Sequence, residues 1–319
     1  MRITKILAAL ALATAVVGAH SAQQFINIAT GGTSGVYYPL GVALSQVFTE
    51  EIPDAKTSVQ STKGSVENLN LLQRGRAELA FALADATADA WESNAEAGFK
   101  GPLDKLRAVA AIYPNYIHLV ASADAGIKTI ADIKGKRISV GAPKSGNELN
   151  TRAILTAAGL SYDDFSKVEY LPYAESVELI KNRQLDMTLL SGGLGVAALR
   201  DLATSIEIVF VPIPAEVVTQ IGNPAYQVGA IPANTYKGQT AELPTVQIRN
   251  LLVTHADVPE DIVYAMTKAL FNNLDHLVNA HHAAKDIALD TATQGLPVPL
   301  HPGAARYYEE ANVQVEPSP

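Results

Sequence analysis

The sequence predicts an α/β protein made of two similar lobes that face each other across a cleft. One strand–turn–helix pattern occurs twice, and Ser34-Gly35 and Ser145-Gly146 stand at the same point of the two copies, 111 residues apart. A second pair of segments, 65–67 and 176–178, reads Ser-Val-Glu in both places and keeps the same offset. Because strands and helices alternate, the sheet should be mostly parallel and flanked by helices.

The elements of the first lobe follow from the first copy. An apolar strand over 25–29 leads through the turn 30–35 into a helix over 36–49, and a second strand is expected over 57–61. A helix over 66–74 ends near Gly75, as helix C-termini often do. A strand over 79–83 follows. The apolar runs 106–113 and 117–122 are interrupted at Pro114 and are expected to cross between the lobes.

The second lobe repeats this order. Strands are predicted over 137–140, 168–171 and 187–190, with helices over 148–158 and 177–182 between them. After a strand over 206–211 the chain is rich in proline and glycine as far as residue 244, which indicates loops. A strand over 246–254 and a helix over 259–272 complete the chain. We therefore assign residues 24–121 and 214–319 to lobe 1 and residues 122–213 to lobe 2.

Residues 1–22 are predicted to be a secretory signal peptide, which places the protein in the periplasm. A short basic segment precedes an uncharged, mostly apolar run over 6–17, and small residues follow, with cleavage expected after residue 19, 21 or 22. The apolar run is too short to span a bilayer, although a membrane anchor is the alternative interpretation. The chain has no cysteine, which excludes disulfides, thiolate metal sites and cysteine nucleophiles.

Composition and charge exclude several classes of partner. The chain of 319 residues is long enough for two domains, and 48% hydrophobic with 18% charged residues is ordinary for a globular protein. Without Arg2 and Lys5 of the leader, 22 basic side chains face 32 acidic ones, a net charge of −10. Nucleic acids and anionic membrane surfaces are therefore poor partners.

The two turns are the candidate binding elements, because the free N–H groups at helix N-termini favour anions. Neither turn contains a phosphate-loop or dinucleotide-binding motif. For a single copy, the alternative is a turn that only packs a helix against a strand. Two copies in register favour a clamp for a small anionic molecule.

Five further residues, in three places of the chain, each have two interpretations. Ser65 is expected to cap a helix, and the functional interpretation adds Lys63 at the edge of the cleft and Asn68 one turn into the helix. His118 lies in the extended run at the lobe crossing and is either a donor to a carboxylate or a satisfied core histidine. Lys144 is either a solvated loop charge or a partner for a carboxylate. No histidine cluster indicates a metal site.

Several segments resemble the TAXI family, the solute-binding subunits of one branch of TRAP transporters. They are residues 28–41, 64–69, 132–137, 140–143, 145–146, 268–271 and 300–304, and the resemblance runs from about residue 25 to 308. It implies a type II periplasmic-binding-protein fold, delivery of a solute to TRAP membrane subunits, and ligands such as glutamate-like amino acids or dicarboxylates like 2-oxoglutarate. Lys63, Lys144 and the segment 190–193 depart from the family pattern.

The sequence analysis thus predicts a monomeric periplasmic receptor for a small anionic solute, without catalytic activity, cofactor or metal. A sensory module for a receptor kinase is the alternative, and an extracytoplasmic enzyme with Ser34, Ser145 or Asp85 as nucleophile is a second rival. The predicted ligand-binding residues are Gly32, Thr33, Ser34, Gly35, Tyr37, Lys63, Gly64, Ser65, Asn68, His118, Lys144, Ser145, Gly146, Asn147 and Ser191.

Overall fold

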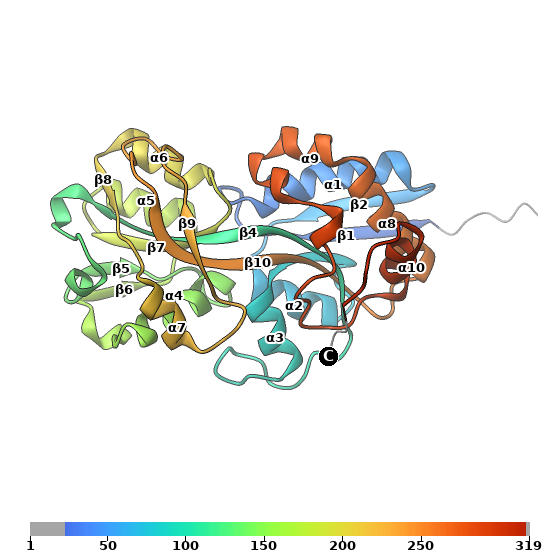
Figure 1. Ribbon diagram of the computed structural model, residues 1–319, viewed down its shortest axis with the longest axis horizontal. Coiled ribbons are helices and arrows are strands. Elements are labelled where there is room, and N and C mark those ends of the chain that lie inside the picture. The colour runs from blue at the N-terminus through green and yellow to red at the C-terminus, as the bar shows by residue number, and fades with distance from the viewer. Residues whose placement is uncertain (1–22, 317–319) are drawn as a thin grey trace, which may run out of the picture.

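A computed structural model describes residues 23–316, so the predicted signal segment 1–22 lies outside the described residues. The chain forms one ten-stranded mixed sheet with the order β2-β1-β3-β10-β4-β7-β5-β6, to which β8 adds through β4 and β9 through β10. Helices cover both ends of this sheet, so that the molecule has two lobes side by side (Figure 1). No helix among residues 23–316 is long and apolar enough to cross a membrane.

The first lobe is built on three parallel strands in the order β2-β1-β3. The C-terminal helices α8, α9 and α10 pack on the same lobe, with α8 and α9 against α1. Its elements are β1 (Gln24–Ala29), α1 (Tyr37–Glu51), β2 (Ala55–Gln60), α2 (Ser65–Gln73), β3 (Leu79–Leu83), α3 (Ala84–Trp91), α8 (Glu260–Asn272), α9 (Leu274–Ala280) and α10 (Pro302–Glu310).

The second lobe repeats this arrangement with β6-β5-β7, so the two parallel triplets have the same second-first-third order. The repeat read from the sequence is therefore a repeat of topology. The elements are β5 (Arg137–Ser139), α4 (Gly146–Ala157), β6 (Lys167–Glu169), α5 (Tyr173–Lys181), β7 (Met187–Gly192), α6 (Ala197–Ser205), β8 (Ile208–Phe210), α7 (Ala215–Ile221) and β9 (Gln227–Ile231).

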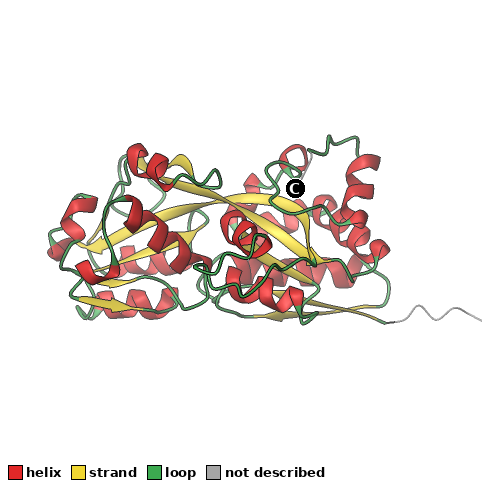
Figure 2. Cartoon of the chain, turned by 90° about the horizontal axis from the view of Figure 1, so that it is seen from below, coloured by secondary structure: helices red, strands yellow, loops and turns green. Residues whose placement is uncertain are grey.

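Two long antiparallel strands, β4 (Leu106–Ser122) and β10 (Leu243–His255), join the lobes. They run from one lobe into the other in both views (Figures 1 and 2). The sequence analysis expected an interruption at Pro114, but β4 is continuous there. Pro114 lies opposite Arg249, next to a register shift in the ladder, where a missing N–H is tolerated.

Two further expectations differ from the structure. Ser65 is the first residue of α2 and Gly64 is its N-cap; the Ser65 hydroxyl instead accepts a hydrogen bond from the Leu83 N–H. Residues 215–242 were assigned to lobe 1, yet α7 packs on α4 and β9 adds to the end of β10 beyond the crossing. Apolar side chains of α7, such as Val217 and Val218, are buried there, which explains that placement.

Candidate functional site

A cavity of about 350 Å³ lies between the lobes, and four helices begin at its wall. The turn before α1 and the turn before α2 line it from the first lobe, while the first residues of α4 and α5 line it from the second. These helices have 15, 9, 12 and 9 residues. Four helix N-termini give this cavity the positive partial charges that bind anions.

Backbone N–H groups in the turn before α1 and at the starts of α2 and α4 have no partner within residues 23–316. The amides of Ser34, Ser65, Gly146 and Asn147 donate to no other group of the described residues, and all four residues line the cavity. The first amides of a helix have no partner within the helix, so they need an outside acceptor. The arrangement can therefore hold a carboxylate or a similar oxyanion from both lobes.

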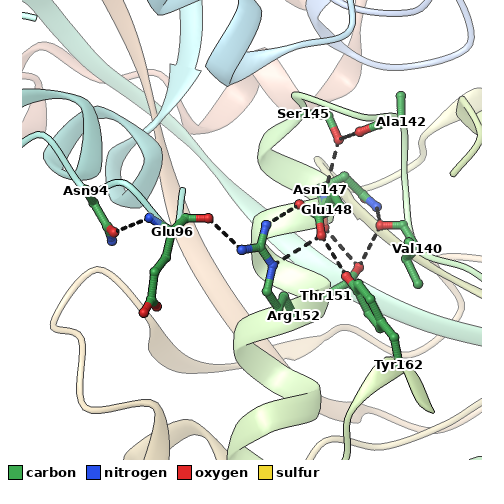
Figure 3. A network of polar contacts seen from close by, with 10 residues as sticks. All are labelled: Asn94, Glu96, Val140, Ala142, Ser145, Asn147, Glu148, Thr151, Arg152 and Tyr162. Carbon is green, nitrogen blue, oxygen red and sulfur yellow. Dashed lines mark hydrogen bonds and ion pairs between the residues drawn. The ribbon is translucent and has the colours of Figure 1, made fainter. Parts of the chain in front are cut away.

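Side chains of α4 fix its first turn to the second lobe. Ser145 is the N-cap: its hydroxyl accepts from the Glu148 N–H at 3.1 Å and donates to the Ala142 carbonyl at 2.6 Å. The side-chain amide of Asn147 donates to the Val140 carbonyl, and Figure 3 shows this contact together with that between Ser145 and Ala142. Asn147 also accepts from the Ser191 N–H at 2.6 Å, so its side chain positions the helix start rather than facing a ligand.

The lobes touch at the rim of the cavity. The Glu67 N–H donates to the Lys144 carbonyl at 3.2 Å, and the Ala198 N–H donates to the Ser34 carbonyl at 3.3 Å. Gly146 allows this approach, because a Cβ there would lie 2.7 Å from both the Leu83 Cδ1 and the Ser65 Oγ. The structure is therefore a closed arrangement of the two lobes.

Among the described residues, one cation and one carboxylate line the cavity, from opposite lobes. Lys63 precedes α2 and is exposed, and its ammonium group forms no ion pair with the described residues. Glu175 lies in the first turn of α5 and is also exposed. A carboxylate in the first turn stabilises its own helix. It also leaves the α5 end of the cavity less suited to an anion than the other three helix starts.

Tyrosines form much of the remaining wall. The Tyr37 hydroxyl donates to Asn250 Oδ1 at 2.5 Å, and the Tyr173 hydroxyl donates to the Ser191 carbonyl at 2.5 Å. Tyr113, in the middle of β4, is the third. Asn115 lies two residues further along this strand and donates to the Ser191 hydroxyl at 3.2 Å. The crossing strands thus contribute to the wall along with the turns.

Most of the predicted ligand-binding residues line this one cavity, although their contact with a ligand stays a prediction. They are Gly32, Thr33, Ser34, Gly35, Tyr37, Lys63, Gly64, Ser65, Ser145, Gly146, Asn147 and Ser191. The exceptions are Asn68, His118 and Lys144. Asn68 is buried and its amide donates to the Thr30 and Phe81 carbonyls, so it ties α2 to the sheet.

His118 and Lys144 also lie outside the cavity. His118 is fully buried, its Nε2 lies 2.9 Å from the Tyr236 hydroxyl, and burial lowers its pKa to about 4. It is thus a core histidine, although only its Nε2 is satisfied: its Nδ1 has no hydrogen-bond partner among the described residues. Lys144 is exposed outside the cavity, and its φ of 64° is a backbone conformation that favours glycine.

The sequence analysis missed the second-lobe wall at Tyr173 and Glu175. Residues 172–175 lie 111 positions after residues 61–64, which the first-lobe turn places in the same cavity. The repeat offset could therefore have identified them. No sequence pattern could have identified Tyr113 and Asn115. The packing of the lobes decides which side chains of a crossing strand reach the cavity.

The described residues give little support for catalysis or for a metal site. Neither Ser34 nor Ser145 is hydrogen-bonded to a histidine, lysine or carboxylate side chain in the part of the chain that the structure describes. Asp85 is buried between Asn150 and Tyr226 and does not line the cavity. Within residues 23–316, no group of three histidine, aspartate or glutamate residues could hold a metal ion.

Comparison with known proteins identifies the relatives of this chain. A model of the NMT1-like family matches residues 28–311, which is most of the sequence. Among solved structures, a protein from Bordetella bronchiseptica RB50 is 17% identical, with a TM-score of 0.51 over 90% of this chain and 98% of that one. At this identity the similarity concerns the fold.

Two further solved structures have ligand-binding or transport descriptions. A putative L-cystine ABC transporter protein from Listeria monocytogenes is 14% identical, with a TM-score of 0.51 over 84% of this chain and 98% of that chain. The alkanesulfonate-binding protein SsuA from Xanthomonas axonopodis pv. citri, bound to MOPS, is 14% identical, with a TM-score of 0.50 over 84% of this chain and 85% of that chain. These matches confirm the predicted type II periplasmic-binding-protein fold.

Proposed function

The chain belongs to the NMT1-like family and has the fold of periplasmic binding proteins, and from this premise we propose that it is an extracytoplasmic solute-binding protein. Its solute is a small anion, either a glutamate-like amino acid or a dicarboxylate such as 2-oxoglutarate. The protein holds this anion between its lobes and delivers it to membrane subunits of a TRAP-type secondary transporter. It binds without catalysing a reaction.

The observation that carries this proposal is the set of free amides in the turn before α1 and at the starts of α2 and α4, on both walls of one cavity. A hydrogen bond to a charged group contributes about 1.5–3 kcal/mol, so four such bonds contribute about 6–12 kcal/mol, which after the cost of association supports binding up to about micromolar affinity. A protein with a net negative charge needs such a local positive potential to bind an anion.

The size and lining of the cavity support a small organic acid. A volume of about 350 Å³ lies at the low end of small-molecule sites. Leu83, Val36 and the tyrosine rings give the wall an apolar part, which suits a carbon skeleton between polar groups. Lys63 adds a mobile cation for a second carboxylate, and Glu175 adds a partner for an ammonium group.

The transporter type rests on the resemblance of residues 28–41 and the other segments to the TAXI family. The apolar run over 6–17 supports export to the periplasm. A TRAP transporter needs a soluble subunit that presents the solute to its membrane subunits. Large multi-span membrane proteins encoded beside this chain would support that assignment, and an adjacent receptor kinase would support the sensory alternative instead.

Isothermal titration calorimetry of refolded, ligand-stripped protein tests the proposed solute class. L-glutamate, 2-oxoglutarate and glutarate should give saturable heat with a stoichiometry of one, and L-norvaline, which lacks the distal carboxylate of L-glutamate, should bind more weakly. MOPS, the sulfonate bound to one structural neighbour, is titrated as a representative of the sulfonates, the alternative class of anion. Heat from MOPS alone, or from no acidic solute, would contradict a carboxylate receptor.

A further inference from the structure

Tyr113 has a buried hydroxyl group that no protein atom satisfies. It lies in the middle of β4, its side chain is 0% exposed, and its hydroxyl makes no hydrogen bond to the described residues. Tyr113 also lines the cavity. A buried hydroxyl without a partner destabilises a protein, and such groups are uncommon unless a bound molecule supplies the partner.

The position of this ring is fixed. A Cβ at residue 193 would lie 3.0 Å from Tyr113 Cε2 and 3.0 Å from the Ala283 Cβ, so glycine at that position makes room for the ring edge. The Tyr113 carbonyl accepts from Asn250 Nδ2 at 2.9 Å, which holds the backbone beneath it. The hydroxyl therefore cannot easily turn toward another protein acceptor.

The neighbouring polar groups already have partners within the protein. Tyr37 and Tyr173 use their hydroxyls on Asn250 and the Ser191 carbonyl. Asn115 donates to the Ser191 hydroxyl and accepts from Asn250. Of these four residues, Tyr113 is the one whose polar side-chain group makes no hydrogen bond to the described residues.

We propose that Tyr113 is a ligand-binding and specificity-determining residue, whose hydroxyl donates a hydrogen bond to an acceptor oxygen of the solute other than the carboxylate held by the helix N-termini. This inference rests on the proposed function and deepens it. The solute then carries oxygen acceptors in two places, one for the free amides of the turns and one for β4. A monocarboxylate with a purely alkyl tail leaves Tyr113 unsatisfied.

The chemistry of the hydroxyl fixes the direction of this bond. Burial, together with the nearby Tyr37 and Tyr173, raises the pKa of Tyr113 well above its usual value, so the group stays neutral and keeps its proton. It therefore donates to a carboxylate, keto or carbonyl oxygen. A site built to bond such an oxygen discriminates strongly against an analogue that lacks it, because its own buried group is then left unpaired.

The variant Tyr113→Phe separates a ligand contact from a structural role. Because the hydroxyl has no protein partner, its removal should leave the thermal unfolding midpoint of the ligand-free protein unchanged or higher. The affinity for L-glutamate should nevertheless fall about tenfold or more, the loss expected for one hydrogen bond to a charged acceptor. Tyr307→Phe, on α10 away from the cavity, is the matched control and should change neither quantity.

The matched solutes L-glutamate and L-norvaline test the specificity claim. Wild-type protein should prefer L-glutamate, and Tyr113→Phe should narrow that preference by lowering the affinity for L-glutamate alone. If wild-type protein binds L-glutamate and the variant stays within twofold for both solutes, the inference is overturned and the proposed function stands. An equal loss for both solutes also overturns the specificity role. If wild-type protein binds neither solute and no other carboxylate, the proposed function fails and this inference fails with it.

Discussion

Asp85 and Asn150 join the two lobes outside the cavity: the Asp85 carboxylate at the start of α3 accepts a 2.6 Å hydrogen bond from the side-chain amide of Asn150 on α4. The Tyr226 hydroxyl donates to the same carboxylate oxygen at 2.7 Å. The other oxygen, Oδ1, has no partner among the described residues. Closure of the lobes thus buries a carboxyl group of the first lobe under polar groups of the second.

This contact predicts that ligand affinity depends on pH. Burial raises the pKa of Asp85 to about 6 in the closed arrangement, and Asp89 on the same helix adds to this shift. In an open, hydrated arrangement the group should titrate near the ordinary value of about 3.9. A proton therefore binds the closed form more tightly, so acid favours closure. Affinity for 2-oxoglutarate should therefore be about tenfold higher at pH 5 than at pH 7.5, as calorimetry can measure.

The variant Asp85→Asn provides the control for that profile. An asparagine there can still accept from Asn150 and Tyr226, but it does not titrate. Its affinity should be nearly constant between pH 5 and 7.5. A flat profile for the wild-type protein, or the same slope in both proteins, would argue against Asp85 as the group responsible.

Gly146 should be required for closure rather than for folding. In Gly146→Ala the added methyl group would lie 2.7 Å from Leu83 and Ser65 of the opposite lobe, a clash that exists only when the lobes meet. Overpacking of this kind costs about 1–3 kcal/mol, so affinity should fall about tenfold or more. The unfolding midpoint of the ligand-free variant should be nearly unchanged.

Gly101→Ala is the matched control for this glycine, since a Cβ there has no atom within 4 Å. It should leave affinity unchanged. Equal affinities for Gly146→Ala and Gly101→Ala would mean that the contact between Gly146 and the first lobe is not part of the bound state.

Much of the fold could be predicted from the sequence because strand and helix periods are local properties. The fold class is confirmed, and the repeat offset corresponds to the matching triplets β2-β1-β3 and β6-β5-β7. The interruption expected at Pro114 is wrong. A proline in the sequence alone indicates the end of a strand, but the register shift between β4 and β10 lets the pairing continue past it. Which lobe holds residues 215–242 depends on tertiary contacts of α7 that no local pattern encodes.

Some parts of the candidate site could likewise be predicted from local sequence, and others could not. The turns before α1 and α4 could be predicted, because small residues before a helix mark an N-terminus in the sequence itself. His118 lies in an apolar stretch of the sequence, and its hydrogen-bond partner Tyr236 is distant in sequence. The environment of this histidine could therefore not be predicted from its neighbours. Tyr113 faces the cavity only because β4 and β10 pair in a particular register, and that register is a long-range property.

Lys63 and Lys144 should behave differently. Lys63 lines the cavity, whereas Lys144 is exposed outside it. An exposed ion pair contributes about 0.2–1 kcal/mol, so Lys63→Ala should weaken 2-oxoglutarate binding up to about fivefold. Lys144→Ala should change it less than twofold. Titration calorimetry at low salt resolves this difference, and losses below twofold in both variants would exclude a role for either lysine.

Glu175 should distinguish amino acids from oxo acids. Its carboxylate lines the second-lobe wall and can attract the ammonium group of L-glutamate, while it repels the anion 2-oxoglutarate. Glu175→Gln should therefore weaken L-glutamate binding and strengthen 2-oxoglutarate binding, each up to about fivefold. A change in the same direction for both solutes would contradict this assignment, and competition between the two solutes measures it in one experiment.

Small-angle X-ray scattering tests most directly whether the protein clamps a solute between its lobes. Ligand-stripped protein should be measured alone and when saturated with whichever of L-glutamate and 2-oxoglutarate binds more tightly. Contacts from both lobes stabilise only the closed state, so saturation should lower the radius of gyration of the wild-type protein. Gly146→Ala should show a smaller decrease at the same occupancy. A radius of gyration that is unchanged at saturation in the wild-type protein would contradict the clamp.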